Sequence, residues 1–199
     1  MQITKNKIEK LFPSVYITLV SMLLGFAVED VISQLRQLNS IGVLSILSGV
    51  SILSAIIAVW TGYSFISMTQ ERLPRFLDVL NPFFFAFCFY MLSSTLGHDT
   101  WYLFAALSIY MASGLFAFIY NARYLMKSVS GTESIKIFRG NIVLLVLALI
   151  IYPLATLLSK GGLLASSVEA SLILYFFITN IIWTYFFCKG WSEIINNIG

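Results

Sequence analysis

The sequence predicts an all-α, polytopic membrane protein, with six transmembrane helices that form three antiparallel hairpins and both termini in the cytoplasm. The 199-residue chain is 59% apolar and only 11% charged, whereas soluble proteins average about 25% charged residues. Six apolar segments have the roughly 20-residue length that crosses the hydrocarbon core of a bilayer. Lys and Arg residues gather on alternate connections between these segments.

The six segments make up a single transmembrane domain, residues 1–199. They are residues 11–32, 41–68, 79–96, 101–120, 142–158 and 163–187. We expect the first segment to be retained, because it is about twice as long as the apolar core of a signal peptide and ends in Glu29 and Asp30 instead of a small-residue cleavage site. The connections are short, so we expect consecutive helices to run antiparallel.

The positive residues predict the orientation. Only Arg36 and Lys160 of the twelve Lys and Arg residues fall on the side opposite the N-terminus. Because Lys and Arg favour the cytoplasmic side, we expect a multi-pass protein of the cell's inner or plasma membrane. The opposite side has four acids, Glu29, Asp30, Asp99 and Glu169. They would concentrate cations there, unless the acidity only reflects the scarcity of positive residues on that side.

A polar seam follows the first segment. At about 100° per residue, one third of the helix circumference contains Ser14, Thr18, Ser21, Gly25 and Glu29. Glu29 lies about 27 Å along the helix from Leu11, near the far edge of a roughly 30 Å core. A carboxylate inside the membrane marks an ion path by default. The alternative is a boundary residue close to water, with Arg36 two turns away.

Two further segments have patterned faces. Small residues in the second segment, with Ser51, Ala55 and Gly62 among them, predict a face that packs closely on another helix. In the fourth segment, Tyr110 belongs to a face with Ser113 and other small or aromatic residues. That face forms hydrogen bonds between helices, lines a wet cavity, or simply packs on a neighbouring helix.

Residues 125–140 form the longest polar stretch and the candidate contact for a cytoplasmic partner protein. Lys127 and Lys136 are the residues that we expect to make this contact. Membrane topology alone explains these positive charges equally well.

The chemistry available for catalysis is sparse, and we expect no enzyme, no metal and no cofactor. His98 is the one histidine, and Cys88 and Cys188 lack the spacing of a metal site or a disulfide framework. The sequence has no Gly-x-Ser-x-Gly elbow and no glycine-rich phosphate loop. A net charge of +3 without a basic stripe gives no indication of nucleic-acid binding.

The six-segment plan resembles that of small prokaryotic six-helix potassium channels. The first helix of that family has a Phe-Ser-Asp-Gly motif, and the comparable stretch here is Phe12-Pro13-Ser14-Val15-Tyr16, which lacks the Asp and the Gly. The filter of that family is therefore not transferred to this chain. The chain length is also similar to that of the substrate-binding subunits of vitamin importers, but their typical pair of glycine-rich spans is absent.

These patterns predict a channel-like or transporter-like subunit that forms homo-oligomers and passes a cation or a small solute. Glu29 would be the outer cation site, and the path would be lined by Ser14, Thr18, Ser21 and Tyr110. The alternative is a non-catalytic membrane anchor, sensor or regulatory subunit that works with a partner protein.

Overall fold

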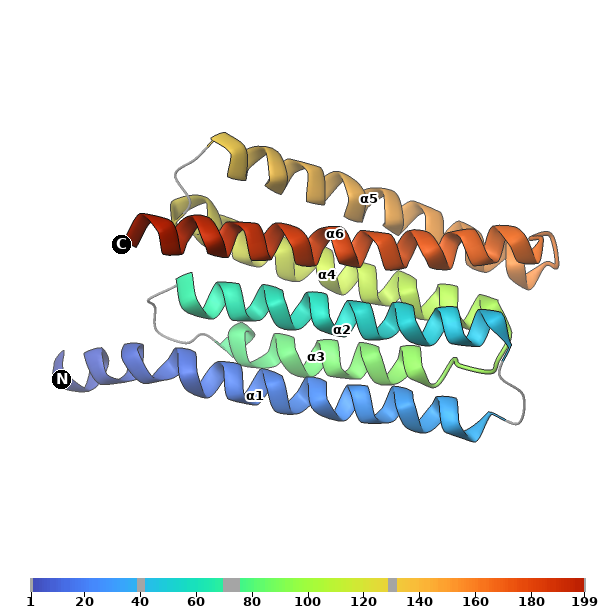
Figure 1. Cartoon of the computed structure of the whole chain (residues 1–199), viewed down its shortest axis with the longest axis horizontal. Coiled ribbons are helices and arrows are strands. Elements are labelled where there is room, and N and C mark those ends of the chain that lie inside the picture. The colour runs from blue at the N-terminus through green and yellow to red at the C-terminus, as the bar shows by residue number, and fades with distance from the viewer. Residues whose placement is uncertain (1, 39–41, 70–75, 129–131, 199) are drawn as a thin grey trace.

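The computed structural model describes the backbone of residues 2–38, 42–69, 76–128 and 132–198, and the side chains of residues 11–38, 42–67, 76–78, 80–120 and 142–189. All regular structure in these residues is helical. The helices are α1 (Gln2–Gln37), α2 (Val43–Thr69), α3 (Phe76–Ser93), α4 (Thr100–Ser128), α5 (Thr132–Lys160) and α6 (Ser166–Ile198). Figure 1 shows them as one elongated bundle.

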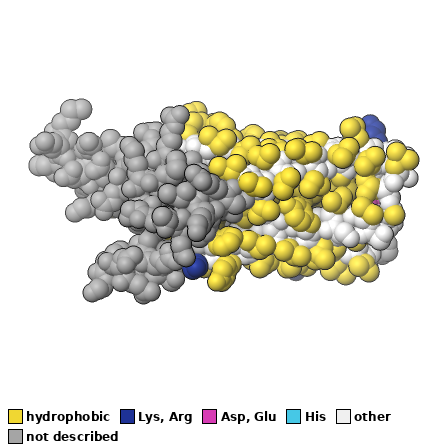
Figure 2. Space-filling view, turned by 90° about the horizontal axis from the view of Figure 1, so that it is seen from above, with side chains coloured by type: hydrophobic (Ala, Val, Ile, Leu, Met, Phe, Trp, Pro, Cys, Tyr) yellow, Lys and Arg dark blue, Asp and Glu magenta, His cyan; other side chains and the backbone are white. Residues whose placement is uncertain are grey.

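Each helix contains a segment long and apolar enough to cross a membrane. These segments are Leu11–Gln37, Val43–Ser67, Phe76–Ser93, Thr100–Tyr120, Ile142–Lys160 and Ser166–Lys189. They match the expected segments closely, because hydropathy over about 20 residues is the main signal for a membrane-spanning helix. Hydrophobic side chains cover much of the described part of the face seen in Figure 2. The prediction of six membrane-spanning helices is confirmed by length and composition.

The helices alternate in direction along the chain (Figure 1). The start of α1 and the end of α6 lie at one end of the bundle, which we call the terminal end. The opposite end has the α3–α4 and α5–α6 turns, and we call it the turn end. Gly97 and Gly162 adopt positive φ angles of 83° and 67° in these two turns, a conformation that glycine adopts without strain.

Contacts between helices follow a closed circuit in the order α1, α2, α6, α5, α4, α3 and back to α1. α5 packs mainly on α4, and α6 packs mainly on α2. Contacts between α5 and α6 are few, and Figure 1 shows the two helices diverging toward the terminal end. The arrangement as three hairpins is therefore not confirmed, because the last two helices do not pack along their lengths.

We expected residues 121–141 to connect two spans, but most of this stretch is helical. α4 continues to Ser128 and α5 begins at Thr132. Hydropathy marks where a span ends, whereas Leu, Met, Lys, Glu and Arg in this stretch favour helix in water as well. The side chains of Lys127 and Lys136 lie outside the described part of the chain.

A chain of buried aromatic rings crosses the interior and receives a residue from every helix. We call it the aromatic chain, and its members are Tyr16, Tyr63, Phe85, Tyr110, Phe176 and Tyr152. Successive ring centroids are 5.8, 6.0, 5.8, 5.7 and 6.4 Å apart. All five contacts are edge-on, a geometry that aromatic pairs favour. The bundle interior is thus closed by side-chain packing at this level.

Candidate functional site

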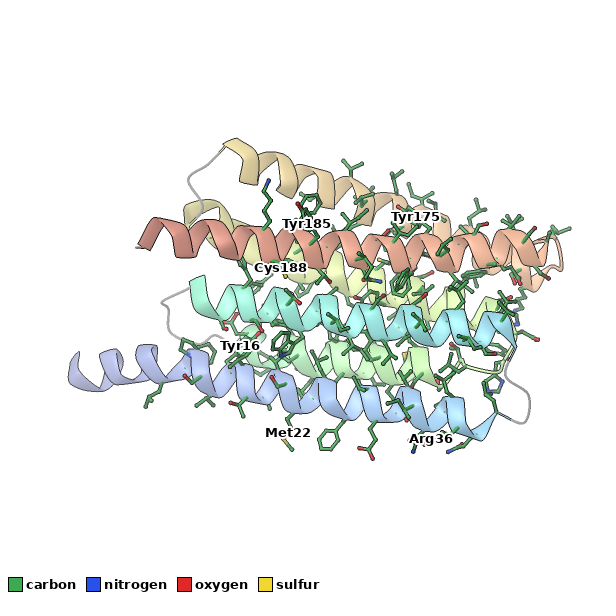
Figure 3. All side chains as sticks on the ribbon, in the orientation of Figure 1. Tyr16, Met22, Arg36, Tyr175, Tyr185 and Cys188 are labelled. Atoms are coloured by element: carbon green, nitrogen blue, oxygen red, sulfur yellow. The ribbon has the colours of Figure 1, made fainter. Side chains whose placement is uncertain are left out.

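The polar seam of α1 lies on the outer surface of the bundle. Its five members are all exposed: Ser14, Thr18, Ser21, Gly25 and Glu29. A Cβ atom added at Gly25 would meet nothing within 4 Å, so the surface is open at the middle of the seam. Met22, also on this side of α1, points away from the bundle in Figure 3. The seam therefore faces lipid or another molecule.

Two hydroxyl groups of the seam already form hydrogen bonds. Thr18 donates to the carbonyl oxygen of Ser14 at 2.9 Å, one turn earlier in the same helix. The indole N–H of Trp60, on α2, donates to the Ser21 hydroxyl at 3.0 Å. Glu29 is exposed and is the member of the seam nearest the turn end. The seam thus presents one carboxylate and a row of small and hydroxyl-bearing residues.

Tyr110 does not lie with the seam. It is 7% exposed and contacts Phe85, Phe89 and Phe176 inside the bundle. The structure therefore brings four predicted path residues, Ser14, Thr18, Ser21 and Glu29, onto one surface. The fifth predicted path residue, Tyr110, lies in the aromatic chain inside the bundle and not on this surface.

The small-residue face of α2 lies where α2 packs on α6. Ser51 and Ala55 are fully buried, and the Ser51 hydroxyl donates to the carbonyl oxygen of Leu47 at 2.7 Å and lies 3.4 Å from that of Ile173 on α6. A Cβ atom at Gly62 would lie 3.2 Å from the ring of Phe187, also on α6. The absence of larger side chains at these positions lets the two helices approach closely.

A buried carboxylate at the turn end joins three helices. Glu169, 9% exposed in the first turn of α6, accepts hydrogen bonds from the hydroxyls of Thr100 and Ser159, each at 2.6 Å. Thr100 begins α4 and Ser159 lies at the end of α5. Sequence reasoning missed this cluster. The signal was available, since alternating helices bring the start of α4, the end of α5 and the start of α6 to one side of the membrane.

A second carboxylate ties α1 to α3 near the turn end. Ser93 donates a hydrogen bond from its hydroxyl to Asp30. Sequence reasoning singled out Glu29 instead, because only Glu29 continues the polar seam. One residue along a helix is a rotation of about 100°, so Asp30 points toward the bundle when Glu29 points away from it.

A cavity of about 80 Å³ lies among α2, α4, α5 and α6, in the half of the bundle nearer the terminal end. Its walls include Gly62, Met111, Ala117, Leu145 and Trp183. No charged side chain is among the described residues that line it. Two polar lining residues, Thr179 and Asn180, donate to carbonyl oxygens of their own helix. The cavity therefore presents a mostly hydrocarbon surface.

Groups suited to metal binding are not gathered in the described residues, where no three His, Cys, Asp or Glu side chains come together. His98 lies in the α3–α4 turn with its ring 5.9 Å from that of Tyr102. Cys88 is buried and Cys188 exposed, and both are free thiols.

By their length and composition, the six apolar helices indicate a multi-pass membrane protein. No protein-family model matches this sequence, and comparisons with curated proteins and with solved structures also give no match. Any assignment of function therefore depends on the polar seam, the buried carboxylates and the cavity.

Proposed function

We propose that the protein is a subunit of an oligomeric channel or transporter for a cation or a small solute. The observation that supports this proposal best is the exposed polar seam on α1, which runs from Ser14 to Glu29. A carboxylate that faces hydrocarbon is unfavourable unless it is paired or hydrated. A second subunit packed near this face would cover the seam and allow water to reach Glu29.

The proposed orientation places both termini in the cytoplasm of a cell with the protein in its inner or plasma membrane. The distribution of Lys and Arg supports this orientation. Glu29 then lies toward the outer side, where a cation would meet it first. Ser14, Thr18 and Ser21 would line the path toward the cytoplasm.

The aromatic chain is the reason for placing this path between subunits. It crosses the interior of the bundle with buried rings from all six helices. A route through one bundle would have to separate those rings, whereas a route along α1 leaves them in contact. We therefore leave Tyr110 out of the proposed path.

Flux into liposomes tests the path directly. Replacement Glu29→Gln removes the charge that would attract a cation, and Ser21→Phe adds a bulky ring on the seam; we expect both to lower the flux. Ala112→Phe is the matched control for bulk, because Ala112 is exposed on α4, away from α1. Flux unchanged by both seam variants would overturn the proposed path.

Cross-linking tests the assembly. In a protein with Cys88 and Cys188 replaced by Ala, Thr18→Cys should form disulfide-linked dimers in membranes if two seams meet. Ile150→Cys is the control, because Ile150 is 62% exposed on α5 and reports only random collision. Equal dimer yields from both variants would argue against assembly through α1.

A second candidate function is a non-catalytic membrane subunit that works with a partner protein. The closed interior favours it, since such a subunit acts through its surface alone. In this case the Thr18→Cys variant would cross-link to a different protein, and the isolated protein would show no flux. A charge reversal at Lys127 and Lys136 would weaken recovery of a cytoplasmic partner.

A further inference from the structure

The cavity near the terminal end is suited to an apolar ligand. Its volume of about 80 Å³ exceeds the roughly 10–15 Å³ that one water molecule needs, yet water also needs polar partners. Most of its lining offers none, because Ala58, Met111, Ala117 and Leu145 are apolar and Thr179 and Asn180 bond within α6. An apolar occupant would gain the dispersion contacts that an empty cavity forgoes.

The loosest junction in the circuit of helices, between α5 and α6, gives such a ligand a way in from the bilayer. Leu145 on α5 and Trp183 on α6 both line the cavity, so it lies beside the two neighbouring helices of the circuit that contact each other least. Figure 1 shows α5 diverging from α6 on this side of the bundle, and in Figure 3 Tyr185 lies on the side of α6 that faces α5. A hydrocarbon chain in the same leaflet could enter sideways without crossing a polar layer.

Two buried donors in the wall add a chemical requirement. The hydroxyl of Tyr63 and the indole N–H of Trp183 are buried and have no hydrogen-bond partner among the described residues. Tyr63 is 5% exposed, and both residues line the cavity. Trp183 can only donate, and a buried donor without a partner is unfavourable. The ligand should therefore bring a hydrogen-bond acceptor into the cavity.

The depth of the two donors in the membrane further restricts the kind of ligand. Tyr63 lies five residues before the end of the apolar segment 41–68, and Trp183 four residues before the end of the segment 163–187, or about 8 and 6 Å at 1.5 Å per residue. This is the upper part of the hydrocarbon layer, directly below the glycerol esters of a phospholipid. An ester carbonyl is an uncharged acceptor at this depth.

We propose that the cavity takes up the first few methylene groups of one acyl chain of a phospholipid from the leaflet at the terminal end, with the ester carbonyl of that chain accepting a hydrogen bond from Tyr63 or Trp183. The chain enters between α5 and α6, and its methylene groups lie against Met111 and Ala117. The headgroup stays outside, so recognition depends on the chain and the ester. This inference is independent of the proposed path along α1.

Photolabelling with a phospholipid that has a diazirine on one acyl chain tests the proposal in vesicles. Met111 is 3% exposed and Ile150 is 62% exposed. A chain in the cavity labels Met111, whereas chains that only surround the bundle label Ile150. We expect both residues to be labelled in the unmodified protein. Label on Ile150 without label on Met111 would overturn the proposal, whether the cavity is empty or filled with water.

Two substitutions of the same kind on α4 sharpen the result. Ala117→Leu fills the cavity and should remove most of the Met111 label, while Ala112→Leu adds the same bulk on the exposed face and should retain it. Gly114→Ala is a milder filling variant, since its Cβ would lie 3.6 Å from Leu145, in ordinary contact. Undiminished Met111 label in folded Ala117→Leu would overturn the proposed position of the chain.

The ester requirement has its own test. A diazirine phospholipid with ether linkages has no carbonyl acceptor, and loss of one hydrogen bond should lower the Met111 label by about fivefold. In Tyr63→Phe, combined with Trp183→Phe, the ester and ether probes should label Met111 equally. Equal labelling by the two probes in the unmodified protein would overturn the role assigned to these donors.

Discussion

The two ends of the bundle are held together by different interactions. At the turn end, Glu169 accepts two hydrogen bonds that join α4, α5 and α6, and Asp30 accepts one that joins α1 and α3. In the half toward the terminal end, α5 and α6 instead border the 80 Å³ cavity, whose lining is mostly apolar. Three rings of the aromatic chain, those of Tyr63, Phe85 and Tyr110, also line this cavity.

This difference indicates where the molecule is rigid. Hydrogen bonds to an ionised group are short, directional and about twice as strong as those between neutral groups. Contacts around a cavity lack neighbours on one side and resist displacement less. We therefore expect α5 to be fixed at the turn end and freer toward the terminal end, where the proposed acyl chain would enter.

Truncation of the aromatic chain should have the largest effect on stability. Phe176 is 1% exposed and contacts both Tyr110 and Tyr152, so Phe176→Ala should lower the free energy of unfolding by about 3 kcal/mol. Denaturant titration in detergent micelles measures this change. Phe87→Ala, on the 55% exposed Phe87 of α3, is the matched control and should change stability little. Equal losses would mean that the interior rings add no more than surface rings.

Removal of the turn-end carboxylate should rank second. Glu169→Ala leaves the hydroxyls of Thr100 and Ser159 without their acceptor and should cost about 2 kcal/mol of unfolding free energy. Glu169→Gln retains an acceptor oxygen and should cost about half as much, because the bonds become neutral. Both values come from the same titration. A smaller loss for Ala than for Gln would contradict the role given to these hydrogen bonds.

The neighbouring acids of α1 give a matched pair with a smaller effect. Asp30 accepts a hydrogen bond from Ser93, whereas Glu29 is exposed. In the monomeric protein, Asp30→Ala should lower the unfolding free energy by about 1.5 kcal/mol and Glu29→Ala by less than about 0.5 kcal/mol. The double variant Asp30→Ala with Ser93→Ala should lose less than the sum of the two single losses. Additive losses would show that the two side chains do not interact.

Much of the fold could be predicted from the sequence, because long apolar segments and short connections leave few alternatives. The six membrane-spanning helices were predicted within a few residues. Helical extensions beyond the spans at Ser128 and Thr132 were not, since hydropathy ends where the membrane does while the helix continues. The partner of α6 was also not predictable: α6 packs on α2 instead of α5 because of contacts distant in sequence.

The candidate sites were harder to predict for a geometric reason. Periodicity places Ser14, Thr18, Ser21 and Glu29 on one face of α1 but does not say whether that face is inside or outside, and the structure places it outside. From the sequence, Glu169 was only one of four acids expected on the side of the membrane opposite the N-terminus. Its partners are 69 and 10 residues away, and only the alternation of six helices brings them together.

The smallest effect that we expect is a difference in the mobility of α5 between the two ends of the bundle. This effect links the fold to the cavity. Spin labels on exposed residues can measure it: Leu157 with Val168 reports the α5–α6 separation at the turn end, and Val143 with Ile182 reports it toward the terminal end. We expect a broader distance distribution for the second pair, measured by pulsed electron paramagnetic resonance in vesicles.

Filling the cavity provides the matched comparison for this measurement. Ala117→Leu should narrow the distribution of the second pair, because the added side chain supplies the contacts that α5 and α6 lack there, and should leave the first pair unchanged. Equal widths at the two ends in the unmodified protein would show that α5 is held as firmly by apolar packing as by the Glu169 hydrogen bonds. In that case an acyl chain could enter only by displacing both helices, and the proposal that it enters between α5 and α6 would be wrong.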